Sequence, residues 1–277
     1  MLIECSFLSY TILLIHAEGE NQGFMTKTFN FKKKTFLIVL LSLLLVICLI
    51  VANYISLGLI KTTASAENVS SNEFEIYMLS LSKSQVEQEA KTIASDYRKL
   101  GAGGYIWKNG EYYHVVSSGY ANKNDAELVQ NSIKINQNLE SEIFSVKFKS
   151  YSLNGTFTGD EKKVFQKALN SCQTLYTSLY DIAISLDTGV YNEISAKLAV
   201  NSASQTLATT YANFNTLYPT SVSSPYAHIN NLNEKAVKLS QKLCSGERIS
   251  TDQTYSSLIK YRYLETLNLF YNFLNEV

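Results

Sequence analysis

The chain has 277 residues, 46% of them hydrophobic and 17% charged, so it is too apolar to be disordered throughout and can hold one large domain or two small ones. Its 24 basic residues (Lys and Arg) equal its 24 acidic ones, and this balance provides no field that would attract nucleic acid. Only 2 prolines and 12 glycines exclude collagen-like and proline-rich classes.

The strongest local signal is an uncharged apolar run over residues 36–60. A run of about 20 such residues spans the hydrocarbon core of a bilayer, so we predict a transmembrane helix here. The excess of lysine before the run predicts a cytoplasmic N-terminus and a C-terminal bulk outside the cytoplasm; these lysines are Lys27, Lys32, Lys33 and Lys34. The alternative is a secretory signal peptide cleaved after Ala64-Ser65-Ala66, which also places the remaining chain outside.

The segments on either side of this run are predicted to be a cytoplasmic N-terminus and a linker. Residues 1–35 form a cytoplasmic N-terminus, within which Met25 resembles an ordinary start. Residues 1–24 are then either a mis-called start or an interfacial segment, because their apolar stretch is too short to span a membrane. Residues 61–73 are rich in Ser, Thr, Ala and Asn and are predicted to be a linker.

Residues 74–150 alternate between strand and helix patterns. Strands are predicted over 74–82, 105–107, 112–118 and 143–148, with a hairpin turn at Asn109-Gly110. A capping box at Ser84-x-x-Glu87 opens a helix that runs to Leu100, and Asn124 caps a second helix. The order βαββαβ predicts a ferredoxin-like sandwich in which a four-stranded antiparallel sheet carries two helices on one face and leaves the other face open.

Residues 156–277 have the pattern of four long helices joined by short links. Capping boxes at Thr158-x-x-Glu161 and Ser250-x-x-Gln253 open the first and the fourth, Val190 begins the second, and Ser224-Pro225 opens the third. Apolar residues recur at helical spacing in the first and the fourth. The predicted fold class is therefore α+β, with a transmembrane helix, the βαββαβ domain and a C-terminal four-helix bundle-like domain.

The segment Phe74–Lys149 resembles the SPOR domain, a peptidoglycan-binding module of bacterial sporulation and cell-division proteins. The resemblance is carried by the strand 76–81, which precedes a helix containing Ala90, by the hairpin into 113–120, and by Asn122–Ala126 at the second helix. It implies a single-pass protein of the bacterial cell membrane that binds peptidoglycan glycan strands. The chain departs from the family at Tyr77 and Leu79, where Gln and Gly are usual, and at His114, where Arg is usual.

Alternation along the strands predicts which side chains face the two helices and which face outward. With Ile76, Met78, Ile106, Tyr113 and Val115 toward the helices, the outward residues include Leu79, Val116 and an aromatic platform on the open face. Aromatic rings stack on sugars and also dominate protein interfaces. The candidate ligand-binding residues are Tyr77, Ser80, Tyr105, Trp107, Tyr112 and His114.

Three functional interpretations follow from this platform. The first is glycan binding in sporulation or cell division. The second is a protein-protein assembly or scaffold factor, with an envelope protein as partner, whose SPOR-like domain no longer binds glycan. The third, a wall-active enzyme, lacks a recognisable nucleophile, base or metal pattern, so we predict no enzyme, no cofactor and no metal. Cys172 and Cys244 are equally consistent with a disulfide and with buried thiols.

Overall fold

The computed structural model describes residues 65–218 and 225–276, all within one compact unit, Thr63–Val277. The predictions for the cytoplasmic segment 1–35, its start at Met25 and the transmembrane segment 36–60 fall outside the described residues. Among the helices in the described part of the chain, none is long and apolar enough to cross a bilayer.

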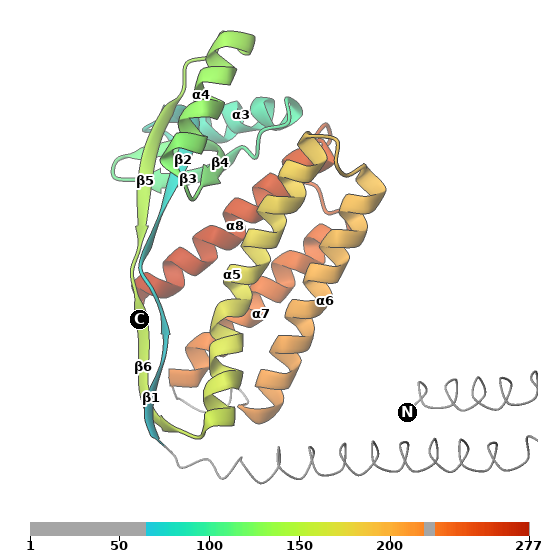
Figure 1. Cartoon of the computed structure of the whole chain (residues 1–277). Coiled ribbons are helices and arrows are strands. Elements are labelled where there is room, and N and C mark those ends of the chain that lie inside the picture. Colours follow the sequence, from blue (N-terminus) through green and yellow to red (C-terminus); the bar gives the residue numbers. More distant parts are fainter. Residues whose placement is uncertain (1–64, 219–224, 277) are drawn as a thin grey trace, which may run out of the picture. The chain divides into compact units, whose positions relative to one another are not determined.

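The described residues form a mixed α+β structure with two antiparallel sheets (Figure 1). In chain order the elements are β1 (Ser65–Ser71), β2 (Phe74–Ser84), α3 (Glu87–Lys99), β3 (Tyr105–Asn109), β4 (Tyr112–Tyr120), α4 (Lys123–Gln137), β5 (Glu142–Phe148), β6 (Tyr151–Phe157), α5 (Gly159–Asp187), α6 (Glu193–Leu217), α7 (Pro225–Cys244) and α8 (Tyr255–Glu276).

The four-stranded sheet has the strand order β3-β4-β2-β5, and every neighbouring pair is antiparallel. The helices α3 and α4 pack on the same face of this sheet. Ala90 and Ala94 of α3 are buried together with Val115 of β4, while Ala126 of α4 is buried together with Leu79 of β2. Small alanines let both helices approach the sheet closely.

Part of the predicted linker is a strand. β1 pairs with β6, and its register continues the pairing of β2 with β5, because Ser71 lies opposite Tyr151 and Phe74 lies opposite Phe148. The ribbon lies along α5, where the Gln166 side chain bonds both the N–H and the C=O of Ser70. The linker prediction for 61–73 is therefore wrong from Ser65 to Ser71, where pairing and the burial of Val69 outweigh a weak strand propensity.

The four C-terminal helices share one hydrophobic core with the sheet. Phe148 of β5, Leu169 of α5, Phe214 of α6, Ile229 of α7 and Phe270 of α8 all belong to this core. The predicted domains 74–150 and 156–277 thus bury their apolar side chains jointly rather than in two separate cores. In Figure 1, α8 (red) runs from the end of the bundle beside α3 to the strands.

The structure confirms some of the predicted helix starts and corrects others. Thr158 and Glu161 form the predicted capping box of α5. The box at Ser84 is wrong because β2 continues through Ser84, and α3 begins at Glu87. The cap of α4 is Asn122, whose side chain accepts a bond from the Asn124 N–H. α8 begins at Tyr255, five residues after the predicted Ser250 cap.

Candidate functional site

The sheet face opposite α3 and α4 is covered by α8. Trp107 is only 4% exposed, and its ring lies 5.6 Å from the ring of Tyr271. Tyr105 packs edge-on against Tyr261, with ring centroids 5.3 Å apart, and its hydroxyl accepts a hydrogen bond from Asn268 at 2.9 Å. The predicted open aromatic face is therefore wrong around Tyr105 and Trp107, because α8 buries its own apolar stripe there.

The facing predicted for β2 is reversed. Tyr77 and Leu79 pack beside α4, whereas Ile76 and Met78 belong to the core that includes α8. The Tyr77 hydroxyl donates to Glu75 at 2.8 Å, on the face away from Trp107. Alternation of apolar and polar residues identifies the buried face of a strand only when the other face is exposed to solvent. Here both faces are covered. Irregular pairing around Ser80 further interrupts the alternation.

Three of the predicted residues remain together at one end of the sheet, namely Ser80, Tyr112 and His114. His114 is 5% exposed, and its Nδ1 lies 3.0 Å from Glu142 Oε1 and 3.2 Å from Ser80 Oγ. The second oxygen of Glu142 bonds Lys83 Nζ at 2.7 Å. We call Ser80, Lys83, His114 and Glu142 the polar cluster.

The polar cluster does not have the geometry of an acyl-transfer triad. A triad places the acid on one ring nitrogen of histidine and the nucleophile on the other. Here Ser80 and Glu142 both approach Nδ1, and the Ser80 hydroxyl donates its hydrogen to Ser82 O at 2.8 Å. Burial lowers the pKa of His114, against the opposing effect of Glu142, and this favours the neutral imidazole. The cluster therefore joins β2, β4 and β5 through hydrogen bonds.

Tyr112 is the only member of the predicted platform that is substantially exposed. Its side chain is 38% exposed, and Lys83 Nζ lies 5.4 Å from its ring centroid. This end of the sheet thus offers one aromatic ring and one amine to the solvent. This is a much smaller surface than the six-residue platform expected from the sequence.

The cysteine and metal predictions concern residues elsewhere in the fold. Of the two alternatives for Cys172 and Cys244, the structure has no disulfide: both are free thiols, of which Cys172 is buried and Cys244 is exposed. Burial raises the pKa of the Cys172 thiol, which keeps it protonated. No group of three or more His, Cys, Asp or Glu side chains within residues 65–218 and 225–276 is placed to hold a metal ion.

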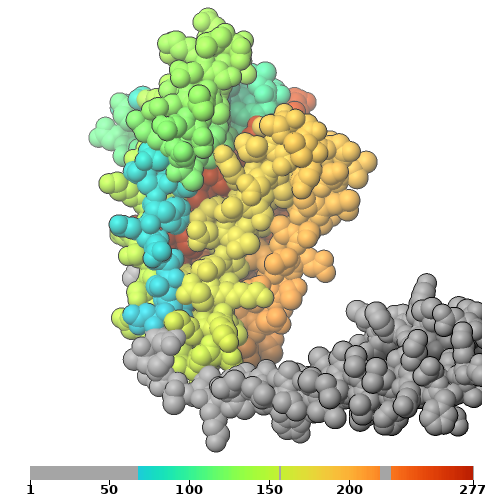
Figure 2. Space-filling model, in the orientation of Figure 1, coloured from blue at the N-terminus to red at the C-terminus, as the bar shows by residue number. Residues whose placement is uncertain are grey.

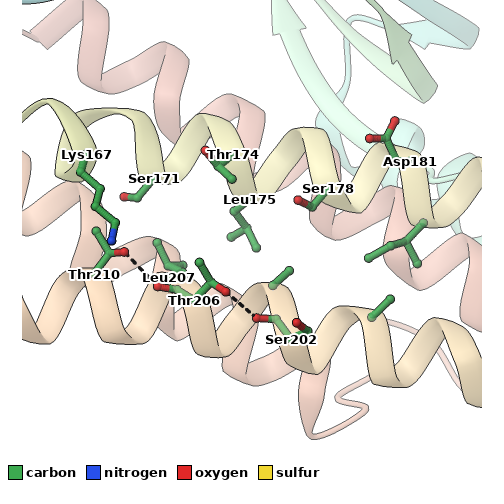
Figure 3. Close-up of a pocket in the computed structure, with 13 residues that line it drawn as sticks. Lys167, Ser171, Thr174, Leu175, Ser178, Asp181, Ser202, Thr206, Leu207 and Thr210 are labelled. Atoms are coloured by element: carbon green, nitrogen blue, oxygen red, sulfur yellow. Dashed lines mark hydrogen bonds between the residues drawn. The ribbon is translucent and has the colours of Figure 1, made fainter. Parts of the chain in front are cut away.

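Two pockets lie away from the predicted platform. The larger, of about 490 Å³, is a groove between α5 and α6 into which Leu175 and Leu207 point (Figure 3), and the buried Ile182 also lines it. The smaller, of about 220 Å³, lies between α3, α4 and the bundle, where Tyr120 and Tyr263 line it. Sequence reasoning missed both. The regular spacing of Ser and Thr along α5 is the signal that marks the larger one.

Comparisons of the chain with protein-family models, with curated proteins and with solved structures found no match.

Proposed function

We propose that this chain is a non-enzymatic, membrane-anchored assembly factor of a bacterial envelope. Its SPOR-like domain acts through protein contact outside the cytoplasm and not by holding glycan. The proposal combines the predicted anchor over 36–60, the resemblance of 74–149 to the SPOR domain, and the position of α8.

The observation that carries the proposal is the burial of Trp107 and Tyr105 beneath α8. A sugar ring stacks on an aromatic face only if that face is free, and these two rings already have protein neighbours. Further contacts join α8 to the sheet, since the Tyr263 hydroxyl donates to Gly119 O at 3.0 Å and the Phe270 ring lies 6.3 Å from that of Phe74. Removing such a helix to admit a ligand would expose a large apolar area, at about 25 cal/mol per Å².

Exposed apolar side chains favour protein contact as the remaining role. On α4, Leu128 and Ile135 are seven residues apart, on the same helical face, and both are largely exposed. Exposed apolar groups are common singly, but neighbouring ones on one face are typical of interaction sites. They lie on a helix of the SPOR-like segment, away from the face that α8 covers.

The test is retention of the detergent-purified full chain on isolated sacculi, before and after stem peptides are removed. We expect no retention above that of an unrelated membrane protein in either case. Tyr112→Ala provides the informative variant, because Tyr112 is the exposed part of the platform. If the chain is retained, and if Tyr112→Ala abolishes this retention while Leu128→Ala does not, then the exposed end of the sheet still binds glycan and the proposal is overturned.

A further inference from the structure

The groove between α5 and α6 suits a helix better than a polar small molecule. Four of its hydroxyl groups already make hydrogen bonds within the fold, and that of Ser171 bonds Ala168 O of its own helix and Asn233 of α7. Thr174 donates to Asn170 O at 3.0 Å, Thr206 to Ser202 O at 3.0 Å, and Thr210 to Thr206 O at 2.9 Å. Such side chains present methyl groups and short polar atoms without free donors, and small residues of this kind allow helices to approach closely.

Five of the α5 residues that line this groove form a regular stripe with opposite charges at its ends. The stripe consists of Lys167, Ser171, Thr174, Ser178 and Asp181. Its spacing of four, three, four and three residues keeps the side chains on one helical face. Figure 3 shows Lys167 at one end of the groove and Asp181 at the other. At 1.5 Å per residue, these two residues are about 21 Å apart along the helix.

Neither charge at the ends of the stripe has an ionic partner among the described residues, since no salt bridge joins Lys167 or Asp181 to another side chain there. On the neighbouring helix, Glu193 and Lys197 at the start of α6 pair with each other at 2.6 Å, and residues 198–217 contain no Asp, Glu, Lys or Arg. The face made by α5 and α6, which lie side by side in Figure 2 (yellow and orange), therefore contains one positive and one negative end with an uncharged surface between them.

The same face exposes large apolar side chains. Leu198 is 66% exposed and lies one turn before Ser202, which lines the groove. Ile194 lies a further turn before Leu198 and is also largely exposed. Covering these residues would supply the apolar burial that a stable contact requires.

We propose that a second copy of this chain docks on the α5–α6 face, with the two α5 helices antiparallel. A two-fold axis beside Thr174, which is midway between the charged residues, places Lys167 of each copy against Asp181 of the other. Only an identical partner gives this match automatically, because a two-fold contact presents the same surface twice. The α5 helix of each copy then lies in the groove of the other. The inference goes beyond the proposed function, since it holds whether or not the chain binds the wall.

The test is site-directed disulfide cross-linking of the full chain in membranes, with Cys5, Cys48 and Cys244 replaced by Ser. Thr174→Cys lies at the proposed axis, and Thr92→Cys, an exposed position on α3, is the matched control. We expect a cross-linked dimer with Thr174→Cys and none with Thr92→Cys. Equal cross-linking at both positions, or none at Thr174→Cys, would overturn the proposal.

Charge reversal then tests the antiparallel register. Added to Thr174→Cys, either Lys167→Glu or Asp181→Lys places like charges together at both symmetric contacts, and we expect each to lower the yield of dimer by about tenfold. The double reversal exchanges the two charges and is expected to restore it. If the double variant gives as little dimer as the single variants, the antiparallel arrangement is wrong. A yield of dimer that none of the three variants changes would also contradict it.

Discussion

Replacing Phe270 by Ala is expected to lower the free energy of unfolding by about 3–5 kcal/mol, the usual cost of removing a fully buried aromatic ring. Phe270 is 0% exposed, and its ring lies 6.3 Å from Phe74 of β2 and 6.1 Å from Tyr176 of α5. It therefore connects α8, to which it belongs, with the four-stranded sheet and with α5. The measurement is denaturant unfolding of the full chain in detergent, monitored by the single tryptophan.

The control for Phe270→Ala is Leu128→Ala on α4. Leu128 is largely exposed, so we expect a change of at most about 0.5 kcal/mol. Because the sheet and the bundle share one core, Phe270→Ala should still unfold in a single transition. Two transitions, with only the later part of the chain destabilised, would show that the sheet and the helices are independent domains.

Gly104 and Gly110 offer a matched pair of substitutions. Both have φ of 60°, in the left-handed region that disfavours a Cβ atom. A Cβ at Gly110 would meet nothing within 4 Å, whereas one at Gly104 would lie 2.7 Å from both Ala94 O and Arg98 Cγ. We expect Gly110→Ala to cost about 1–2 kcal/mol. Gly104→Ala adds overpacking and is expected to cost about 2–5 kcal/mol in total.

The same unfolding measurement distinguishes the two glycine variants. Gly104 lies between α3 and β3, and its carbonyl accepts a bond from Arg98 Nη1 at 2.7 Å. A Cβ there must push α3 from the sheet, because Ala94 O belongs to the helix backbone. Equal losses in the two variants would mean that backbone conformation alone accounts for the cost and that the approach of α3 is not tight.

Much of the fold follows from local patterns in the sequence. The strand order of residues 74–148 agrees with the βαββαβ pattern, and the capping residues Thr158 and Glu161 mark the start of α5 correctly. These features depend on neighbours in sequence, such as a turn glycine or a helix cap. Apolar residues at helical spacing similarly predicted the first and the fourth C-terminal helices, α5 and α8.

The candidate site was harder to predict because it depends on contacts distant in sequence. Nothing within β3 indicates that Trp107 meets Tyr271, more than 150 residues later. The facing of β2 failed for the same reason, since Ile76 and Tyr77 both find apolar surroundings. Strand β1 was missed because its sequence lacks the apolar alternation that usually marks a strand. It is held in place by its pairing with β6, which is distant in sequence.

Fluorescence of Trp107 in the full chain tests most directly whether α8 covers the sheet. It is the only tryptophan, so the signal is unambiguous. With 4% exposure beside Tyr271, we predict a blue-shifted emission maximum and weak quenching by acrylamide. Emission at the wavelength of free indole, with quenching as strong as that of a free tryptophan derivative, would show that the face is open and would contradict both the closed sheet and the function proposed from it.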